Sequence, residues 1–304
     1  MTKLEHVRFR GGTAVVTGAA SGMGEHLARG LAARGCGLAL VDRDAERLAS
    51  VAAAISRTHP TVPVASYVAD LAEPADVDHL AVEVLAAHPR ITLLINNAGV
   101  SMSGAFDQVS ADEFDWTMQI NFRAPAVLIR ALLPPRRGTP GRPKVETASQ
   151  WGVAVPPHNA AYATSKFALR GLSESLRHDL ARHDVGVTTV FPGGVATRIV
   201  EEGRTAVAIP DEQIDQRRLA AQKLLTYPAD RAAKRILRGV EKREARVVFT
   251  ASAIVVDLAT RLFPTRYPAV LETITGIRTR FFTGTGTREN ADRPAAPSLD
   301  TAQR

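Results

Sequence analysis

The sequence predicts an α/β fold, a doubly wound parallel sheet of seven strands with a C-terminal helical extension. From Thr13 onward, short apolar, β-branched runs alternate with segments whose apolar residues recur at helical spacing. The runs are apolar almost throughout, which is typical of parallel strands that helices cover on both faces. The 304 residues are 45% hydrophobic and 23% charged, and a chain of this length can bury a sizeable core.

The alternation is clearest in the first half of the chain. The expected strands are TAVVTG from Thr13, GLALVD ending at Asp42, VASYVAD ending at Asp70 and ITLLIN ending at Asn96. The expected helices are Gly22–Arg34, Asp44–Arg57, Pro74–Ala87 and Asp112–Leu132. The third of these helices has a proline in its first turn, where proline is well tolerated.

The second half is less regular. A surface loop rich in proline, glycine and arginine, PPRRGTPGRPK, precedes a weak strand, KVETAS, because Lys144 and Glu146 are poor strand residues. The later expected elements are a helix over Ala160–His183, a strand VGVTTVF, one helix within the polar segment Gly194–Leu225, a helix after Pro228 and a strand RVVF. We therefore expect a single domain over residues 1–250, an amphipathic extension over 251–283 and a disordered tail over 284–304.

Composition and charge limit the function classes. Cys36 is the one cysteine, which excludes an internal disulfide and a zinc site of the usual Cys/His kind. The net charge is +7, yet the residues from Arg217 onward carry 17 basic and eight acidic side chains, an excess of nine. Without a nucleic-acid motif, a solvated basic helix face is the favoured explanation, and no nucleic-acid partner is expected. No apolar run is long enough to span a bilayer and no signal sequence is recognisable, so we expect a cytoplasmic protein.

A glycine turn, TGAASGMG at Thr17–Gly24, joins the first strand to the first helix. Glycine permits close approach of a ligand, and the helix N-terminus offers free N–H groups to a pyrophosphate. A tight turn with no ligand is the alternative explanation. Asp42 at the end of the second strand favours the nucleotide, because an acidic residue about 20 residues on can accept the ribose hydroxyls. It would repel a 2′-phosphate, so NAD is expected and NADP is less favoured, although Arg43 could meet that phosphate.

Four polar side chains form a candidate catalytic set. Tyr162 and Lys166 are four residues apart on an expected helix and therefore share a face. Ser149 ends the fifth strand, and Asn121 lies in the helix after the fourth. Ligands in such sheets bind at the carboxyl ends of the strands, which puts Ser149 on the cofactor side.

Together these features resemble the short-chain dehydrogenase/reductase (SDR) family, over roughly Thr13–Phe249. The resemblance rests on seven motifs in order: TGAASGMG, Asp70, NNAG at Asn96–Gly99, Asn121, Ser149, YATSK at Tyr162–Lys166 and PGGVAT at Pro192–Thr197. It implies a Rossmann fold and no metal. It also implies cofactor contacts from Gly18, Ser21, Gly22, Met23, Gly24, Asp42, Arg43, Asp70, Leu71, Asn97, Ala98, Gly99, Tyr162, Lys166, Pro192, Gly193, Val195 and Thr197.

The resemblance also implies catalytic roles. Tyr162 would exchange a proton with the substrate oxygen. A tyrosine has an ordinary pKa of about 10, and the Lys166 cation would favour its phenolate. Lys166 would also hold the nicotinamide ribose, Ser149 would hydrogen-bond the substrate oxygen, and Asn121 would hold a water that links Lys166 to solvent. A structural asparagine in the core is the alternative for Asn121.

Cofactor contacts are implied for other matched positions. Asp70 would contact the adenine, Asn97 and the Gly99 region the adenosine side, and Thr197 the carboxamide. Asn97 could instead have a purely structural role, joining strands through buried hydrogen bonds.

We therefore expect an oxidoreductase that interconverts a secondary alcohol and a ketone with NAD(H). The alternative is a non-catalytic dinucleotide-binding sensor or scaffold, but such proteins usually lack a catalytic residue. By family resemblance we also expect a homodimer or homotetramer.

The extension has apolar residues at helical spacing, which must be buried against something. They are Ile254, Val255, Leu258, Leu262 and Phe263, with Val270, Leu271, Ile274 and Ile277 repeating the pattern. The protein's own sheet edge or a partner subunit is one cover. A lid over the substrate cleft, or peripheral contact with a membrane, is the other, and either of these implies a lipophilic substrate.

Overall fold

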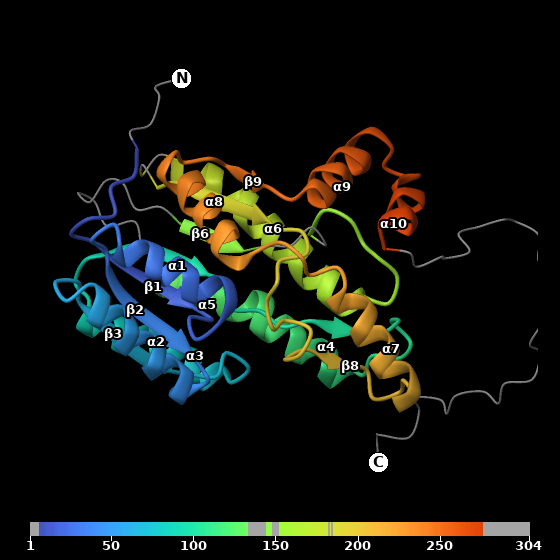
Figure 1. The fold of residues 1–304 in the computed structure, drawn as a ribbon, viewed down its shortest axis with the longest axis horizontal. Helices are drawn as coiled ribbons and strands as arrows, with labels where there is room; N and C mark the ends of the chain where they lie inside the picture. Colours follow the sequence, from blue (N-terminus) through green and yellow to red (C-terminus); the bar gives the residue numbers. More distant parts are fainter. Residues whose placement is uncertain (1–5, 133–143, 148–151, 182, 184, 276–304) are drawn as a thin grey trace, which may run out of the picture.

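The computed structural model describes residues 6–132, 144–147, 152–181, 183 and 185–275, and its centre is a seven-stranded parallel sheet (Figure 1). The spatial order is β3-β2-β1-β4-β6-β7-β9. The first three strands extend the sheet in one direction from β1, and β4 and the later strands extend it in the other, so the strand order reverses between β1 and β4. The strands are β1 Thr13–Thr17, β2 Gly37–Asp42, β3 Val64–Val68, β4 Ile91–Asn96, β6 Lys144–Thr147, β7 Val187–Phe191 and β9 Arg246–Val248. Such a switch point leaves a crevice at the carboxyl ends of β1 and β4. The predicted fold class is confirmed.

Helices cover both faces of the sheet (Figure 1). On one face α1 (Gly22–Ala32), α2 (Ala45–Thr58) and α8 (Ala229–Glu241) bury their apolar sides in one core cluster with β1 and β2. On the other, α3 (Pro74–Ala87) and α5 (Ala124–Leu132) belong to a second cluster. The near-continuous apolar runs of the strands follow from this cover on both sides.

The expected helix over Asp112–Leu132 is wrong in one respect, because three helical segments occupy this range. They are α4 (Ala111–Met118), a π-helical turn over Gln119–Arg123 and α5. Pro125, the second residue of α5, lies two positions beyond this turn and lacks a backbone N–H. Turns of the π-helical kind are often found at functional sites. The other expected helices of the first half agree with the structure to within two residues at each end.

A small second sheet was not predicted. Its two-residue strands, β5 (Met102–Ser103) and β8 (Arg204–Thr205), pair in parallel. The buried Glu113 adds a second attachment, since its Oε1 accepts a hydrogen bond from the Val207 amide at 3.0 Å. The segment that follows β7 is therefore fixed to the segment that follows β4.

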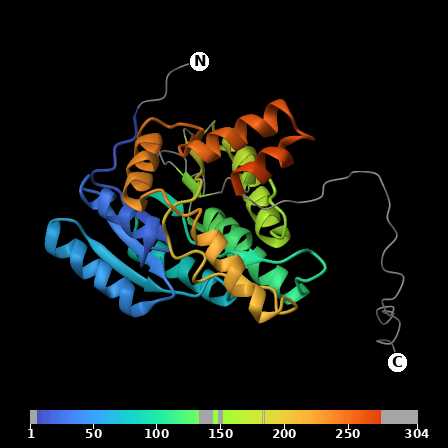
Figure 2. The same ribbon diagram turned by 45° about the vertical axis from the view of Figure 1, so that its right-hand side comes forward.

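The C-terminal extension forms two helices, α9 (Ala251–Leu262) and α10 (Tyr267–Thr275), at one edge of the molecule (Figures 1 and 2). The apolar face expected to be buried is exposed in this single chain, with side chains 47–60% accessible at Ile254, Val255, Leu258, Leu262 and Phe263. The buried face of α9 consists instead of Ala253, Val256 and Ala259. Cover by the protein's own sheet edge is therefore not what the structure shows. The expected loop over 134–143 and the tail over 284–304 lie outside the described residues.

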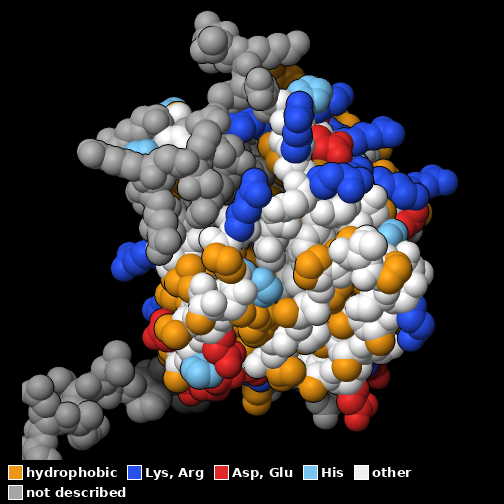
Figure 3. All heavy atoms as spheres, turned by 90° about the vertical axis from the view of Figure 1, so that its left-hand side faces the viewer, with side chains coloured by type: hydrophobic (Ala, Val, Ile, Leu, Met, Phe, Trp, Pro, Cys, Tyr) orange, Lys and Arg blue, Asp and Glu red, His pale blue; other side chains and the backbone are white. Residues whose placement is uncertain are grey.

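Part of the basic excess lies on one helix face. The exposed residues Arg231, Lys234, Arg238 and Lys242 follow one another at helical spacing along α8. Lys and Arg side chains gather in the upper right of Figure 3, on the side of the molecule where α8 lies. A solvated helix face therefore accounts for part of the charge. No helix in the described ranges is long and apolar enough to cross a membrane.

Cys36 provides a simple check on the core. Its side chain is fully buried in the core cluster that α1, α2 and α8 form with β1 and β2. Burial raises the pKa of the thiol to about 12. At pH 8 only about one thiol in ten thousand would be the reactive thiolate. We expect no reaction of the folded protein with a disulfide-exchange reagent such as dithiodipyridine, and one thiol per chain after unfolding in urea. Stoichiometric labelling of the folded protein would contradict this packing.

Candidate functional site

The glycine turn lies between β1 and α1 and shapes the floor of the site. Gly18 and Gly22 have positive φ angles of 65° and 55°, which glycine adopts without strain. A Cβ at Gly18 would lie 2.9 Å from Cα of Ala98, so a larger residue would collide with the backbone after β4. Ser21 precedes α1, and its side chain does not cap the helix. The first N–H groups of α1 are therefore available to an anion.

Asn97 braces this turn from the end of β4. Its Nδ2 donates hydrogen bonds to the carbonyl oxygens of Thr17 at 3.0 Å and Gly18 at 3.2 Å. The Thr17 hydroxyl accepts bonds from the amides of Asn97 and Ala98, both at 3.1 Å. The Asn97 side chain therefore has the structural role that was the alternative explanation. Asn97 still lines the pocket.

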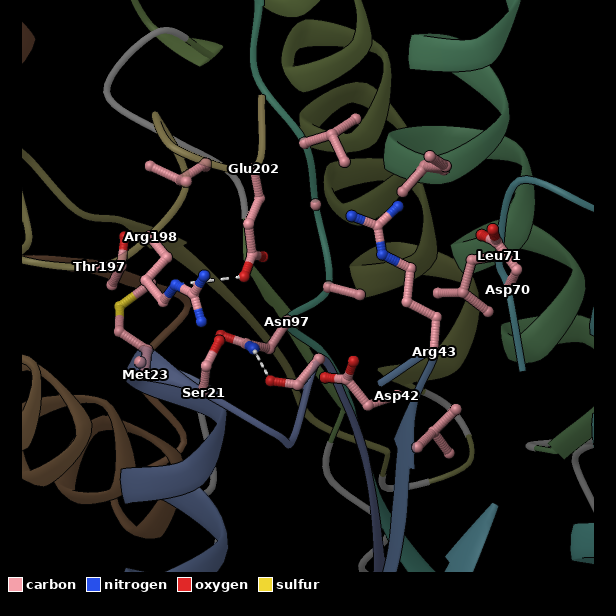
Figure 4. A pocket seen from close by; sticks show the side chains of 18 of the residues that line it. Ser21, Met23, Asp42, Arg43, Asp70, Leu71, Asn97, Thr197, Arg198 and Glu202 are labelled. Carbon is pink, nitrogen blue, oxygen red and sulfur yellow. Dashed lines mark hydrogen bonds and ion pairs between the residues drawn. The ribbon is translucent and has the colours of Figure 1, made fainter. Parts of the chain in front are cut away.

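A pocket opens at the carboxyl ends of β1 to β4, as Figure 4 shows. The segment after β7 closes its other side. Twelve residues predicted from the sequence line it, namely Gly18, Ser21, Gly22, Met23, Asp42, Arg43, Asp70, Leu71, Asn97, Ala98, Gly99 and Thr197. Its position matches the crevice expected at the switch point between β1 and β4.

Asp42 and Arg43 lie at one end of the pocket. The Asp42 carboxylate accepts bonds from the Ala20 amide at 2.9 Å and from the Asp44 amide at 3.1 Å. Each oxygen therefore keeps a lone pair for a further donor. Arg43 is exposed and forms no ion pair with any residue in the described part of the chain. In Figure 4 the two side chains leave the end of β2 in different directions.

Three lining residues from the segment after β7 were missed by sequence reasoning. They are Arg198, Ile199 and Glu202. Glu202 Oε1 lies 3.3 Å from Nη1 of Arg47 on α2 and 3.5 Å from Nε of Arg198. This carboxylate links the segment after β7 to α2. No motif could have found it, because the segment is irregular and its ion pairs are formed only in the fold.

Tyr162 and Lys166 lie together on α6 (Ala160–Ala181), as their spacing predicted. Tyr162 is 7% and Lys166 3% exposed, and Nζ of Lys166 lies 5.7 Å from the tyrosine ring centroid. Neither lines the pocket directly. Nζ nevertheless lies 3.0 Å from the point that a Cβ of the lining residue Gly99 would occupy. Glycine at this position therefore lets the ammonium reach the pocket wall.

Asn121 sits in the π-helical turn, next to the same glycine. Its Oδ1 accepts a bond from the Val100 amide, and its Nδ2 donates to the Val100 carbonyl, both at 2.9 Å. Nδ2 also donates to Ser165 Oγ at 3.0 Å. Both amide hydrogens are used, so the side chain braces the loop after β4 against α6. Its link to a solvent water remains a prediction.

Some predicted cofactor contacts are placed behind the pocket rather than in its lining. Gly24 packs against Gly18, where a Cβ would overlap the carbonyl oxygen. Gly193 packs in the same way against Thr250, and Val195 forms a bridge with Tyr227. Pro192 is buried and also outside the lining. The contacts of these residues with a cofactor remain predictions. The remaining catalytic candidate, Ser149, lies outside the described residues.

The pocket residues fit a dinucleotide. Free helical N–H groups suit a pyrophosphate, a carboxylate with spare lone pairs suits ribose hydroxyls, and glycine leaves room for the ligand against the backbone. Between Asp42 and Gly99 the lining runs along the ends of four strands, which suits an elongated ligand.

Comparison with known proteins agrees with this geometry. The family model of the short chain dehydrogenases matches residues 12–208. SadH of Mycobacterium tuberculosis is 32% identical over 261 residues, which cover 85% of this chain and 93% of the relative. A short-chain dehydrogenase/reductase from Burkholderia phymatum in complex with NAD has a TM-score of 0.76 at 29% identity, covering 84% of this chain and 94% of that one.

A second solved structure holds the other cofactor. A short-chain dehydrogenase from Sphingobium yanoikuyae in complex with NADPH has a TM-score of 0.68 at 28% identity, covering 90% of this chain and 99% of that one. The chain belongs to the short-chain dehydrogenase/reductase family of NAD- or NADP-binding oxidoreductases.

Proposed function

We propose that the protein is an NAD-dependent dehydrogenase that interconverts a lipophilic secondary alcohol and its ketone. One observation carries the proposal: Tyr162 and Lys166 are buried together on α6, and Nζ of Lys166 lies against Gly99 in the pocket wall. A proton-transfer group beside a cofactor pocket is what alcohol oxidation requires. A sensor or scaffold has no need of this pair.

Tyr162 is the proposed general acid and base. In the oxidation direction its phenolate would accept the proton of the alcohol, and in reduction its hydroxyl would donate a proton to the ketone oxygen. The Lys166 ammonium, 5.7 Å from the ring centroid, favours the phenolate by charge attraction. Burial of both residues strengthens that attraction, because water screens it poorly. The bound nicotinamide supplies the exchange of hydride.

Asp42 supports NAD as the cofactor. Its carboxylate can accept the ribose hydroxyls, and it would repel a 2′-phosphate. We expect the wild type to bind NAD more tightly than NADP. Asp42→Ala should shift the ratio of the two dissociation constants toward NADP by roughly tenfold to a hundredfold, since a bond to a charged group contributes about 1.5–3 kcal/mol. Arg43 would then meet the phosphate.

Titration calorimetry with both cofactors measures this ratio, and Asp44→Asn is the matched control. Asp44 caps α2 and pairs with Arg47 but does not line the pocket. Asparagine caps a helix about as well as aspartate, so this change should alter the free energy of unfolding little and leave the ratio unaltered. A wild type that already prefers NADP would reject Asp42 as the discriminating residue.

The packing of the extension supports a lipophilic substrate. Val256 of α9 and Leu271 of α10 form a buried cluster with Ala154, in the segment that follows Ser149 in the sequence. The extension thus adjoins the catalytic side and can add an apolar wall to the cleft. A screen of alcohols and ketones, followed by the absorbance of the reduced cofactor, should give higher kcat/KM for bulky apolar substrates. Preference for small polar substrates such as sugars would contradict this part of the proposal.

A further inference from the structure

Arg170 joins the helix that carries Tyr162 and Lys166 to the segment that starts at Gly152. It lies on α6, one helical turn beyond Lys166, and its Nη1 donates a hydrogen bond to the carbonyl oxygen of Gly152 at 3.2 Å. Gly152 is the first described residue after Ser149. It also touches the helix backbone, since a Cβ there would lie 3.0 Å from the carbonyl oxygen of Lys166. Arg170 therefore holds the segment that starts at Gly152 against the helix that carries Tyr162.

The guanidinium of Arg170 is itself held in place. Its Nε donates to Oε1 of Glu174 at 2.9 Å, and this bond lowers the pKa of Glu174 below its ordinary value. Its Cζ lies 6.0 Å from the ring centroid of Phe191, a fully buried residue that ends β7. Such a contact adds cation–π attraction to the hydrogen bonds.

A second arginine packs on the same ring and leads to the C-terminal extension. Cζ of Arg246, on β9, lies 4.6 Å from the Phe191 centroid. Arg246 Nη2 is 2.6 Å from Oδ1 of Asp257 on α9, and Asp257 Oδ2 is 3.0 Å from Arg261. Burial lowers the pKa of Arg246, and the Asp257 carboxylate opposes that shift. Asp257 is only 16% exposed, so this pair is poorly screened by water.

We propose that Arg170 is a positioning residue of the active site, and that Asp257 of α9 supports it through Arg246 and Phe191. The proposal rests on the dehydrogenase function proposed above. The C-terminal extension thus acts on catalysis through the contacts from Asp257 to Arg246, Phe191 and Arg170, in addition to any role in substrate binding. Arg170 does not line the cofactor pocket, so its loss should affect turnover and leave cofactor binding intact.

The kinetic test compares Arg170→Met, Arg170→Lys and Asp257→Asn in the full chain. Arg170→Met should lower kcat by about tenfold or more, because misplacement by about 1 Å can cost up to a hundredfold. The dissociation constant of NAD should change by less than about twofold. Arg170→Lys keeps the charge but loses the planar fork, so it should restore part of kcat. Asp257→Asn should lower kcat by about threefold. The kcat of the Arg170→Met/Asp257→Asn double variant should not be lower than that of Arg170→Met alone, because both changes act through the same series of contacts.

Glu244→Gln is the matched control, since it breaks the Arg235–Glu244 ion pair, which is also 2.6 Å long and lies away from the pocket. Its kcat should equal that of the wild type. Equal kcat for Arg170→Met and this control, or additive losses in the double variant, would overturn the proposal.

A second readout needs no substrate. Hydrogen exchange of the NAD-loaded protein should be faster over residues 152–159 in Arg170→Met and in Asp257→Asn, and unchanged there in Glu244→Gln. Unchanged exchange over this segment in Arg170→Met would overturn the proposal even if no substrate is turned over. Absence of turnover in the wild type would instead contradict the proposed function.

Discussion

Tyr162→Phe should remove most turnover and leave cofactor binding and the fold in place. Phenylalanine deletes only the hydroxyl, so the buried ring keeps its packing on α6. A general acid or base contributes roughly 10²–10⁴-fold to the rate, and we expect a loss of kcat in that range. Steady-state kinetics with the best alcohol of the screen measures it, with NAD affinity measured on the same preparation.

Tyr67→Phe is the control for this change. Tyr67 lies on β3, and its hydroxyl is 2.9 Å from Nε2 of His88. Neither residue lines the pocket. This variant also loses one tyrosine hydroxyl, and its kcat should match the wild type. Near-full activity of Tyr162→Phe would reject the assignment of Tyr162 as acid and base.

Gly24→Ala should strongly reduce cofactor binding. The added Cβ would overlap the carbonyl oxygen of Gly18 and lie 2.7 Å from Nδ2 of Asn97, the two groups that fix the turn. Relief requires the glycine turn to move, because backbone cannot yield as a flexible side chain can. Overpacking of this kind costs about 1–3 kcal/mol. We expect an increase of about tenfold to a hundredfold in the dissociation constant of NAD, by titration calorimetry.

Gly171→Ala is the matched control for Gly24→Ala. Gly171 is exposed on α6, and a Cβ there would meet no atom within 4 Å. Alanine in a helix interior is favoured over glycine by about 1 kcal/mol, so the free energy of unfolding should rise while NAD affinity stays the same. Unaltered NAD affinity in Gly24→Ala would mean that the turn does not hold the cofactor.

The sheet could be predicted from sequence because its strands are nearly continuous apolar runs bounded by turn residues. Even the segment Lys144–Thr147, with Lys144 and Glu146, forms β6 between β4 and β7. Pro125 could have signalled an interruption in the helix after β4. Its π-helical form could not be predicted, because it accompanies the hydrogen bonds of Asn121 to Val100 and Ser165. Those partners meet only in the fold, and nothing in the local sequence marks them.

The exposed face of α9 illustrates a different limit. Periodicity identifies the larger apolar residues as the face to be buried, but the structure buries Ala253, Val256 and Ala259. Alanines allow the helix to approach closely, and the Asp257–Arg246 ion pair fixes its rotation. Within the single chain the larger apolar residues stay exposed, so their burial against a partner subunit or a membrane remains a prediction. Among the pocket residues, the motif positions after β1 to β4 were predicted from the sequence. Glu202 was not, because its ion pair with Arg47 on α2 forms only in the folded protein.

The most direct test of the proposed reaction is to follow the hydrogen that leaves the alcohol. The best secondary alcohol of the screen is prepared with deuterium on the carbon that bears the hydroxyl and is incubated with the protein and NAD. Mass spectrometry of the reduced cofactor should find one deuterium per molecule, with an equal amount of ketone formed, because hydride passes directly between the two. Ketone formation with deuterium lost to water, or NAD that stays oxidised with every alcohol and ketone pair tested, would contradict the account.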